Sequence, residues 1–360
     1  RRPGEVRLHN FQAIARGADS ALFFQWRQSR GSEEMHHSGI VSQAGHEHTR
    51  VFQEVAGLGA ELRTLGTQLL GTRVPARVAL MFSWPNWWAV EYKPGLSASL
   101  NYPDEVLRYY SALWQRNIPV DIISPDSPLD DYDLVIAPLL YMVSERQGAA
   151  IERYVAAGGV FLTTYFSGIA AEDGRAWLGG YPGPLRRTLG IWVEEVDPLE
   201  PGQSNSLVMS DSERISPGPY TCDLWGEVLH LEGARALAQF GHDFYAGCPA
   251  VTEHRFGQGW AYYIATRPEP QFLDQMLGVV LDELKIAAPL TVPKGVEVTQ
   301  RCAGERRFIF VLNHHPEEQE ISLLEPMHDL LTGQMYEHRL SLVGRGVAIL
   351  VAQSTDTAAA

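Results

Sequence analysis

The sequence predicts an α/β protein whose central domain is a doubly wound, mostly parallel sheet. Four short apolar runs alternate with stretches of helical periodicity, and they cover residues 77–83, 120–123, 133–138 and 158–167. Such alternation is typical of β-α-β crossovers, which place parallel strands in one sheet and helices on both of its faces. Gly158-Gly159 is a helix stop placed directly before the last of these strands.

The segment before this domain predicts an incomplete unit made of one helix, one strand, a polar loop and a second helix. Residues 20–26 are apolar on both faces of the expected strand, and the second helix is expected over residues 47–69. A single strand cannot pair its own backbone groups or bury its own side chains. We therefore expect this strand to complete a sheet whose other strands lie outside this sequence.

The segment after the domain predicts a small antiparallel β-domain. Short alternating runs separated by Gly, Asn and Pro begin near Pro289. Between the parallel strands of the central domain and this β-domain, we expect three further features. They are an excursion of little regular structure over residues 198–219, short antiparallel strands that include residues 223–231, and a helix over residues 271–284. The expected division is residues 1–72, 73–288 and 289–353, followed by a disordered tail, 354–360.

Bulk composition excludes several classes of function. The net charge is −14 and basic residues do not cluster, so neither nucleic acid nor an anionic membrane is an expected partner. No apolar run approaches the length that spans a bilayer. The three cysteines, Cys222, Cys248 and Cys302, are widely spaced, which fits a reducing, cytoplasmic compartment and neither a disulfide framework nor a zinc site.

No cofactor or metal is expected. Gly179-Gly180 and the prolines around them do not follow a strand and open a helix, as a phosphate-binding loop must. His314 and His315 are adjacent, so their side chains diverge and do not converge on one ion.

The central domain resembles the class I glutamine amidotransferase fold, which requires a nucleophile on a tight turn between a strand and a helix. The equivalent turn is residues 165–168, where there is no cysteine and Ser167 lacks the Gly-x-Ser-x-Gly pattern. His242 and Asp243 are possible partners, but nothing in the sequence ties them to Ser167. We expect no nucleophile here, and a hydrolase using Ser167 remains the alternative.

Two other segments carry candidate binding chemistry. Trp84, Trp87 and Trp88 lie in an expected loop after the first strand, where a core cluster or an interface is favoured over a sugar platform. The polar loop of residues 27–39 follows the C-terminal end of its strand, where barrel enzymes place substrate contacts. A solvated loop is the alternative there.

An ordered set of segments resembles the C-terminal part of family 42 glycoside hydrolases, the β-galactosidases. The segments include Phe23-Phe24-Gln25-Trp26 and Thr164-Tyr165-Phe166-Ser167-Gly168, and the resemblance extends to about residue 352. The other matching segments are residues 2–11, 27–29, 144–145, 158–159, 178–183, 189–190 and 245–250.

The resemblance implies a (β/α)8 barrel ending at residue 72, then an amidotransferase-like trimerisation domain without an active site, then a β-domain. Residues 20–26 would be the last barrel strand, and the protein would be a homotrimer. Retaining glycosidases use two carboxylates about 5 Å apart. The family carries both on earlier barrel strands, so they are expected upstream of Arg1 and the chain alone is expected to be inactive.

The resemblance also implies substrate contacts in the polar loop. The family has Glu-x-x-His there, bound to galactose hydroxyls, and the match is Glu34 with His37, with Glu33 and His36 as the alternative register. Trp26 would stack under the sugar ring or belong to the barrel core. The alternative function is a non-catalytic trimerisation module or a truncated paralogue.

Overall fold

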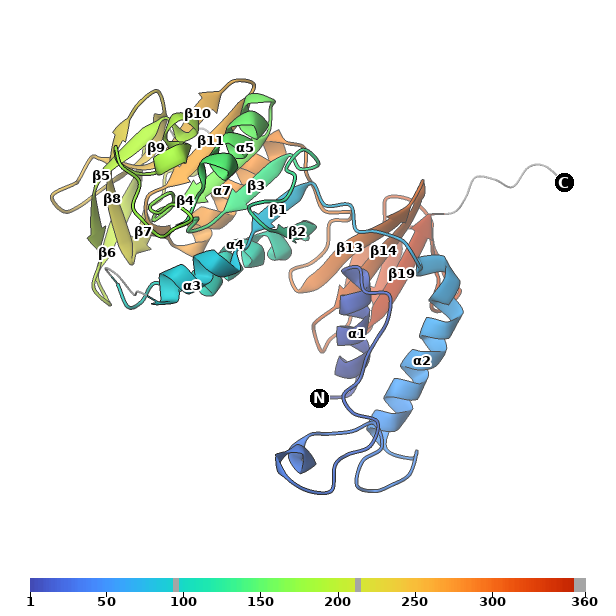
Figure 1. The fold of residues 1–360 in the computed structure, drawn as a ribbon. Helices are drawn as coiled ribbons and strands as arrows, with labels where there is room; N and C mark the ends of the chain where they lie inside the picture. The colour runs from blue at the N-terminus through green and yellow to red at the C-terminus, as the bar shows by residue number, and fades with distance from the viewer. Residues whose placement is uncertain (93–96, 211–214, 353–360) are drawn as a thin grey trace. The chain divides into compact units, whose positions relative to one another are not determined.

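The computed structural model describes residues 1–92, 97–210 and 215–352, which form two compact units (Figure 1). We call residues 76–287 the middle unit, and residues 1–75 with the chain from Ala288 onward the terminal unit. Across the described residues, no helix has both the length and the apolar character needed to cross a bilayer.

The middle unit is built on a ten-stranded sheet in the order β12-β7-β6-β9-β10-β11-β4-β3-β1-β2. Its parallel half confirms the predicted doubly wound arrangement, with Val78 in register with Val120 on one side and Leu134 on the other. Every residue of β1, β3 and β4 is buried, as expected of strands covered on both faces. The parallel strands are β1 (Val78–Met81), β2 (Val120–Ile123), β3 (Leu134–Ala137), β4 (Val160–Thr164) and β11 (Gly259–Ile264).

Local sequence explains the helices of this unit. Asn101 caps α4 (Tyr102–Gln115) by accepting a hydrogen bond from the Asp104 N–H at 3.0 Å, and Ser144 opens α5 (Glu145–Ala156) with a capping box. The helix α4 buries Val106, Tyr109 and Leu113, whose spacing places them on one face. The remaining helices are α3 (Trp84–Tyr92), η2 (Gly183–Leu185), α6 (Arg186–Leu189) and α7 (Pro270–Glu283).

Antiparallel strands extend the sheet beyond β11 and add a separate ribbon. The extension is β6 (Ser204–Met209), β7 (Tyr220–Asp223), β9 (Arg235–Phe240), β10 (Pro249–Phe256) and β12 (Arg267–Pro268). The ribbon pairs β5 (Ile191–Pro198) with β8 (Trp225–Leu231).

Two local predictions for the middle unit were wrong, and the bounds of a third were displaced. The tryptophan-rich segment is the helix α3, because Ser83 caps it through the Asn86 N–H at 3.2 Å. The excursion at residues 198–219 contains β6, although residues 211–214 lie outside the described part. The strand expected over residues 223–231 is divided between β7 and β8 at Leu224, whose φ of 66° is incompatible with extended backbone.

The terminal unit joins two helices to an antiparallel β-structure. The helices α1 (Glu5–Ala15) and α2 (Arg50–Leu69) cover one face of a five-stranded sheet. Side chains alternate along β14, so Phe308 and Phe310 pack against these helices while Ile309 packs in a second core on the other face. The sheet comprises β13 (Val296–Ala303), β14 (Arg306–Asn313), β19 (Val347–Ala352), β16 (Met327–Asp329) and β17 (Met335–Tyr336). The strands β15 (Gln319–Ser322) and β18 (Arg339–Leu342) form a separate pair.

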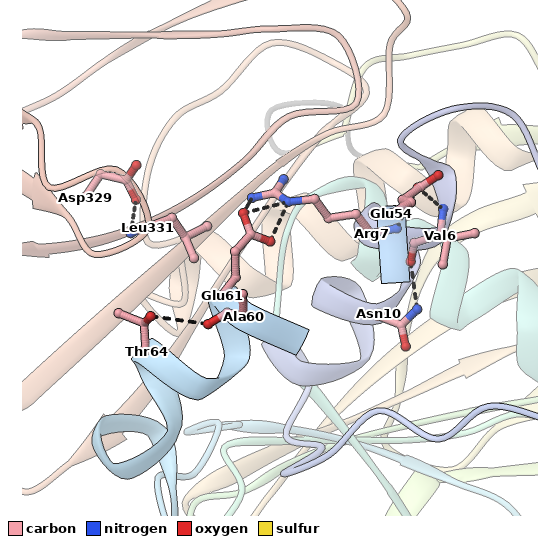
Figure 2. A network of polar contacts seen from close by, with 9 residues as sticks. All are labelled: Val6, Arg7, Asn10, Glu54, Ala60, Glu61, Thr64, Asp329 and Leu331. Carbon is pink, nitrogen blue, oxygen red and sulfur yellow. Dashed lines mark hydrogen bonds and ion pairs between the residues drawn. The ribbon is translucent and has the colours of Figure 1, made fainter. Parts of the chain in front are cut away.

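Buried and half-buried charges connect the helices to each other and to this sheet. Figure 2 shows the Arg7 guanidinium of α1 on the Glu61 carboxylate of α2, with the shortest nitrogen–oxygen distance 2.8 Å. Glu297 of β13 is buried and accepts hydrogen bonds from Arg16 at 2.8 Å and Gln12 at 2.7 Å. Burial acts to raise the pKa of Glu297, but these donors and His314 hold it below its ordinary value.

Arg301 is the most completely buried charge of the terminal unit. Its guanidinium donates to the carbonyl of Ile14 in the last turn of α1 at 2.9 Å and to the carbonyl of Ala18 beyond that helix at 2.8 Å. It also donates to the Asp19 carboxylate at 2.7 Å. It also donates to the carbonyls of Leu69 and Thr72 at the end of α2. A single arginine thus satisfies the C-terminal carbonyls of both helices.

Two predictions for the terminal unit have other outcomes. Residues 20–26 are not a strand, because a strand requires a ladder and the described structure pairs this segment with no neighbouring strand. The predicted disordered tail, residues 354–360, lies outside the described residues.

Candidate substrate-binding loop

The polar loop of residues 27–39 is closed at its base by backbone hydrogen bonds between residues 25–28 and residues 40–41. The Ile40 N–H donates to the Gln25 carbonyl at 2.9 Å, and the Val41 N–H donates to the Trp26 carbonyl at 2.7 Å. The Gln28 N–H returns a bond to the Val41 carbonyl at 3.0 Å. The two ends are therefore held together in parallel orientation, and the residues between them project as one excursion.

Gly39 is required for this closure. A Cβ placed on Gly39 would lie 2.4 Å from the Gln28 nitrogen and 2.8 Å from the Arg27 carbonyl carbon. Both atoms belong to the backbone, so neither can move aside as a flexible side chain would. The sequence gives no pattern that would single out this glycine, because its partners are eleven and twelve positions earlier.

Glu34 and His37 lie on one tight turn at the tip of the loop. Residues Glu33–His36 form the 3-10 helix η1, and the His37 N–H closes it on the Glu34 carbonyl at 3.0 Å. The Glu34 carboxylate accepts a hydrogen bond from the Ser29 hydroxyl at 3.2 Å, and the His37 ring meets the Phe24 ring edge to face at 6.3 Å. Both side chains are exposed, so both can reach a ligand outside the loop.

Trp26 is exposed at the base of the loop within the described residues. Its indole is 65% exposed and meets the Phe52 ring of α2 edge to face, with centroids 6.2 Å apart. The described structure therefore leaves one face of this ring open, as a stacking role requires. It does not by itself bring Trp26 into contact with Glu34 or His37.

A hollow of about 330 Å³ opens on the other side of the same segment. Phe23, Phe24, Ser38, Gly39 and Ile40 line it together with side chains of α1 and α2. Glu34, His37 and Trp26 are not among its lining residues. The predicted sugar contacts and this hollow are therefore separate features.

The turn of the middle unit that is equivalent to the nucleophile turn of the amidotransferase fold has Phe166 at a positive φ. Phe166 has a φ of 59°, and Ser167 is fully buried. The Ser167 hydroxyl accepts a hydrogen bond from the Leu140 N–H at 2.9 Å. The Thr163 hydroxyl donates its proton to the Ala137 carbonyl, so it accepts from the Ser167 hydroxyl, also at 2.9 Å. Ser167 therefore has a structural role, and the hydrolase alternative finds no support.

A buried carboxylate holds this turn in place. Glu227 of β8 accepts hydrogen bonds from the Phe166 N–H at 2.8 Å, the Trp225 indole at 3.1 Å and the Tyr263 hydroxyl at 2.7 Å. Burial raises the pKa of Glu227 to about 7 against the effect of these donors. The sequence analysis missed this residue, because its partners lie on distant strands and no local pattern connects them.

His242 and Asp243 do not provide the missing base. The His242 backbone forms two hydrogen bonds with the Asn205 side chain, and Asp243 sits at a positive φ of 72° in the turn before β10. Among the described residues, no group of three or more His, Cys, Asp and Glu side chains is arranged to hold a metal ion. The candidate binding site is therefore the loop around Glu34, whose polar side chains are exposed.

Comparison with known proteins gives three matches that follow one another along the chain. Residues 76–287 match the profile described as "Beta-galactosidase trimerisation domain", residues 1–65 match "Beta-galactosidase", and residues 295–352 match "Beta-galactosidase C-terminal domain". The loop that carries Glu34 and His37 lies within the residue 1–65 match.

The chain belongs to glycoside hydrolase family 42, the β-galactosidases, and corresponds to their C-terminal portion. It is 47% identical over 351 residues to beta-galactosidase BgaA of Planococcus sp. (strain 'SOS Orange'), covering 97% of this chain and 52% of that protein. It is 40% identical to beta-galactosidase LacZ of Lactobacillus acidophilus, and the match covers 93% of this chain and 50% of that protein.

Solved structures show the same architecture. The beta-galactosidase from Bacillus circulans sp. alkalophilus superimposes with a TM-score of 0.95 at 43% identity, over 98% of this chain and 52% of that one. The family and the fold class predicted from the sequence are confirmed. The chain spans about half the length of the relatives that it matches.

Proposed function

We propose that this chain works within a retaining β-galactosidase that removes terminal non-reducing β-D-galactose from β-galactosides. The observation that carries the proposal is the ordered match of all three parts of the chain to β-galactosidase profiles. The two carboxylates of the double displacement, about 5 Å apart in retaining enzymes, would come from the region that the relatives have and this chain does not span.

The parts of the chain would divide the remaining work. Residues 1–72 would complete the catalytic barrel, residues 73–288 would assemble a homotrimer, and residues 289–353 would form the C-terminal β-domain. Family membership and the printed description of the residue 76–287 match support this division. The buried Ser167 and the Phe166 turn agree with an assembly role, since neither offers a nucleophile. We further propose that the enzyme acts in cytoplasmic carbohydrate metabolism, which the acidic surface and reduced cysteines fit.

Within this enzyme, Glu34 and His37 would orient galactose, and Trp26 would stack against its ring. A carboxylate accepts hydrogen bonds from hydroxyls, and an imidazole can donate or accept, so together they match two neighbouring sugar hydroxyls. Such contacts raise kcat/KM when they strengthen toward the transition state. Exposure of all three side chains and the closed base of the loop support these roles.

The test compares Glu34→Gln with Glu33→Gln in protein expressed together with the coding sequence that precedes Arg1. We expect Glu34→Gln to lower kcat/KM on a chromogenic β-galactoside about 10- to 100-fold, the value of one hydrogen bond to a charged group. Glu33→Gln, on the same 3-10 helix, should stay within about 2-fold of wild type. The chain of 360 residues alone should show no hydrolysis.

The outcomes separate the registers. A large loss in Glu33→Gln with a normal Glu34→Gln would assign the sugar contacts to Glu33 and His36. Wild-type rates in both variants would reject the loop as a substrate site. Activity in the 360-residue chain would mean that carboxylates within it perform the chemistry.

The second candidate is a non-catalytic assembly module, which the missing nucleophile of the middle unit favours. A reading frame that stops before Arg1 would support it. A continuous frame encoding a barrel with two strand-end glutamates would support the enzyme.

A further inference from the structure

The middle unit has one surface where large apolar side chains gather. Trp84 is 56% exposed, Trp88 is 61% exposed and Tyr92 is 84% exposed, all on α3. Leu107 of α4 and Ile122 of the edge strand β2 are also exposed. The other large exposed apolar side chains among the described residues of this unit are Leu178, Val208, Leu231 and Phe244. We call Trp84, Trp88 and Tyr92 the α3 patch.

Ring contacts hold the first tryptophan of the α3 patch against the middle unit. The Trp84 and Trp87 rings stack with centroids 5.1 Å apart, and Phe82 meets both edge to face. Trp87 packs against the core of the unit and its indole donates to the Glu91 carboxylate. Aromatic rings held by a buried neighbour lose little conformational freedom on binding, which favours them at interfaces.

Charge also points to this surface. The chain carries a net charge of −14, so two copies repel one another over most of their surfaces. The helix α3, with the sequence WPNWWAVEY, has Glu91 as its one charged residue, and that carboxylate is held by Trp87. A contact between like-charged copies is least costly where the surface is apolar and uncharged.

We propose that the α3 patch is a contact surface between copies of this protein. The inference rests on the proposed homotrimer and locates part of its interface on one helix. Trp and Tyr are enriched at such interfaces, and the profile that covers α3 is described as a trimerisation domain. In Figure 1, α3 lies on the outside of the middle unit beside α4.

The test uses protein expressed together with the coding sequence that precedes Arg1, at about 20 µM. Its mass is measured by sedimentation velocity and by light scattering after size exclusion. The variants are Trp88→Ser with Tyr92→Ser, and separately Trp88→Glu, which adds a charge to the patch. The matched control is Phe244→Ser, since Phe244 is 66% exposed and lies on another element, in the turn before β10. We expect wild type and the control to be trimers, and both patch variants to dissociate at least 10-fold more readily.

Circular dichroism and thermal unfolding verify that each variant folds. If the double variant is unfolded, Trp88→Glu alone provides the test. Folded patch variants that stay trimeric would overturn the proposal while leaving the trimer intact. Monomeric wild type would instead reject the proposed homotrimer. Patch variants that remain trimeric but lose retention on a β-galactan matrix would reassign the patch as a sugar platform.

Discussion

The parallel strands of the middle unit and the helix–sheet contact of the terminal unit are stabilised in different ways. The parallel half of the middle unit has strands buried along their whole length, whereas the terminal unit places Arg301 and Glu297 between its helices and its sheet. Apolar burial is non-directional and tolerates conservative exchange, but a buried charge requires every partner in place. The comparison implies that single substitutions of buried polar groups damage the terminal unit most.

Replacing Arg301 by methionine should have the largest effect. Four backbone carbonyls and the Asp19 carboxylate at the ends of α1 and α2 would each lose a hydrogen bond. Asp19 is half exposed and can be hydrated, so the cost comes from the buried carbonyls, at about 1–3 kcal/mol for each one left without a donor. Hydrogen exchange followed by mass spectrometry should show lost protection in α1 and β13, with β3 and β4 unchanged.

The matched control is Arg306→Met, because Arg306 lies on the neighbouring strand with an exposed guanidinium over the Phe308 ring. It should change stability by less than about 0.5 kcal/mol. Equal protection in Arg301→Met and wild type would contradict the view that this arginine joins helices to sheet.

Glu227 tests whether the middle unit also depends on one buried charge. Burial raises its pKa from 4.5 to about 7, so between these values the folded unit binds more protons than the unfolded chain. The free energy of unfolding should therefore fall as pH rises from about 5 to 7, by at most about 3 kcal/mol. Glu227→Gln, which keeps an acceptor for Phe166, should lose most of that dependence.

Exchange rates of peptides spanning residues 160–168, measured from pH 5 to 8 and corrected for intrinsic rates, report this slope. Glu232→Gln is the control, since Glu232 is an exposed partner of Arg186. An identical slope in Glu227→Gln and wild type would remove Glu227 as its source.

Gly39→Ala should have a smaller effect, confined to the loop of the terminal unit. The new Cβ would meet the Gln28 nitrogen at 2.4 Å, and overpacking of this kind costs about 1–3 kcal/mol. The Ile40 and Val41 amides, which close the loop, should exchange about 10-fold faster or more.

Gly31→Ala provides the comparison within the same loop, because no atom lies within 4 Å of the Cβ position there. It should leave the exchange of both amides unchanged. If both glycine variants behaved like wild type, Gly39 would not be what closes the loop.

The sequence by itself determined the regular elements and the candidate loop. Apolar runs and helix stops sufficed for β1, β3, β4 and α5, since strand burial and helix capping are written in neighbouring residues. The Glu34 and His37 assignment came from a family resemblance, and the structure adds their common turn. It remains a proposal until the glutamate variants are measured.

Only the tertiary structure decided which polar residues hold the molecule together. Arg301 reaches partners near residues 14 and 69, and Glu227 reaches Phe166 and Tyr263. The segment at residues 20–26 has strand-like composition but no ladder within the described residues, because pairing depends on neighbours and not on composition. Local pattern fixes local conformation, whereas long-range hydrogen bonds exist only once distant elements meet.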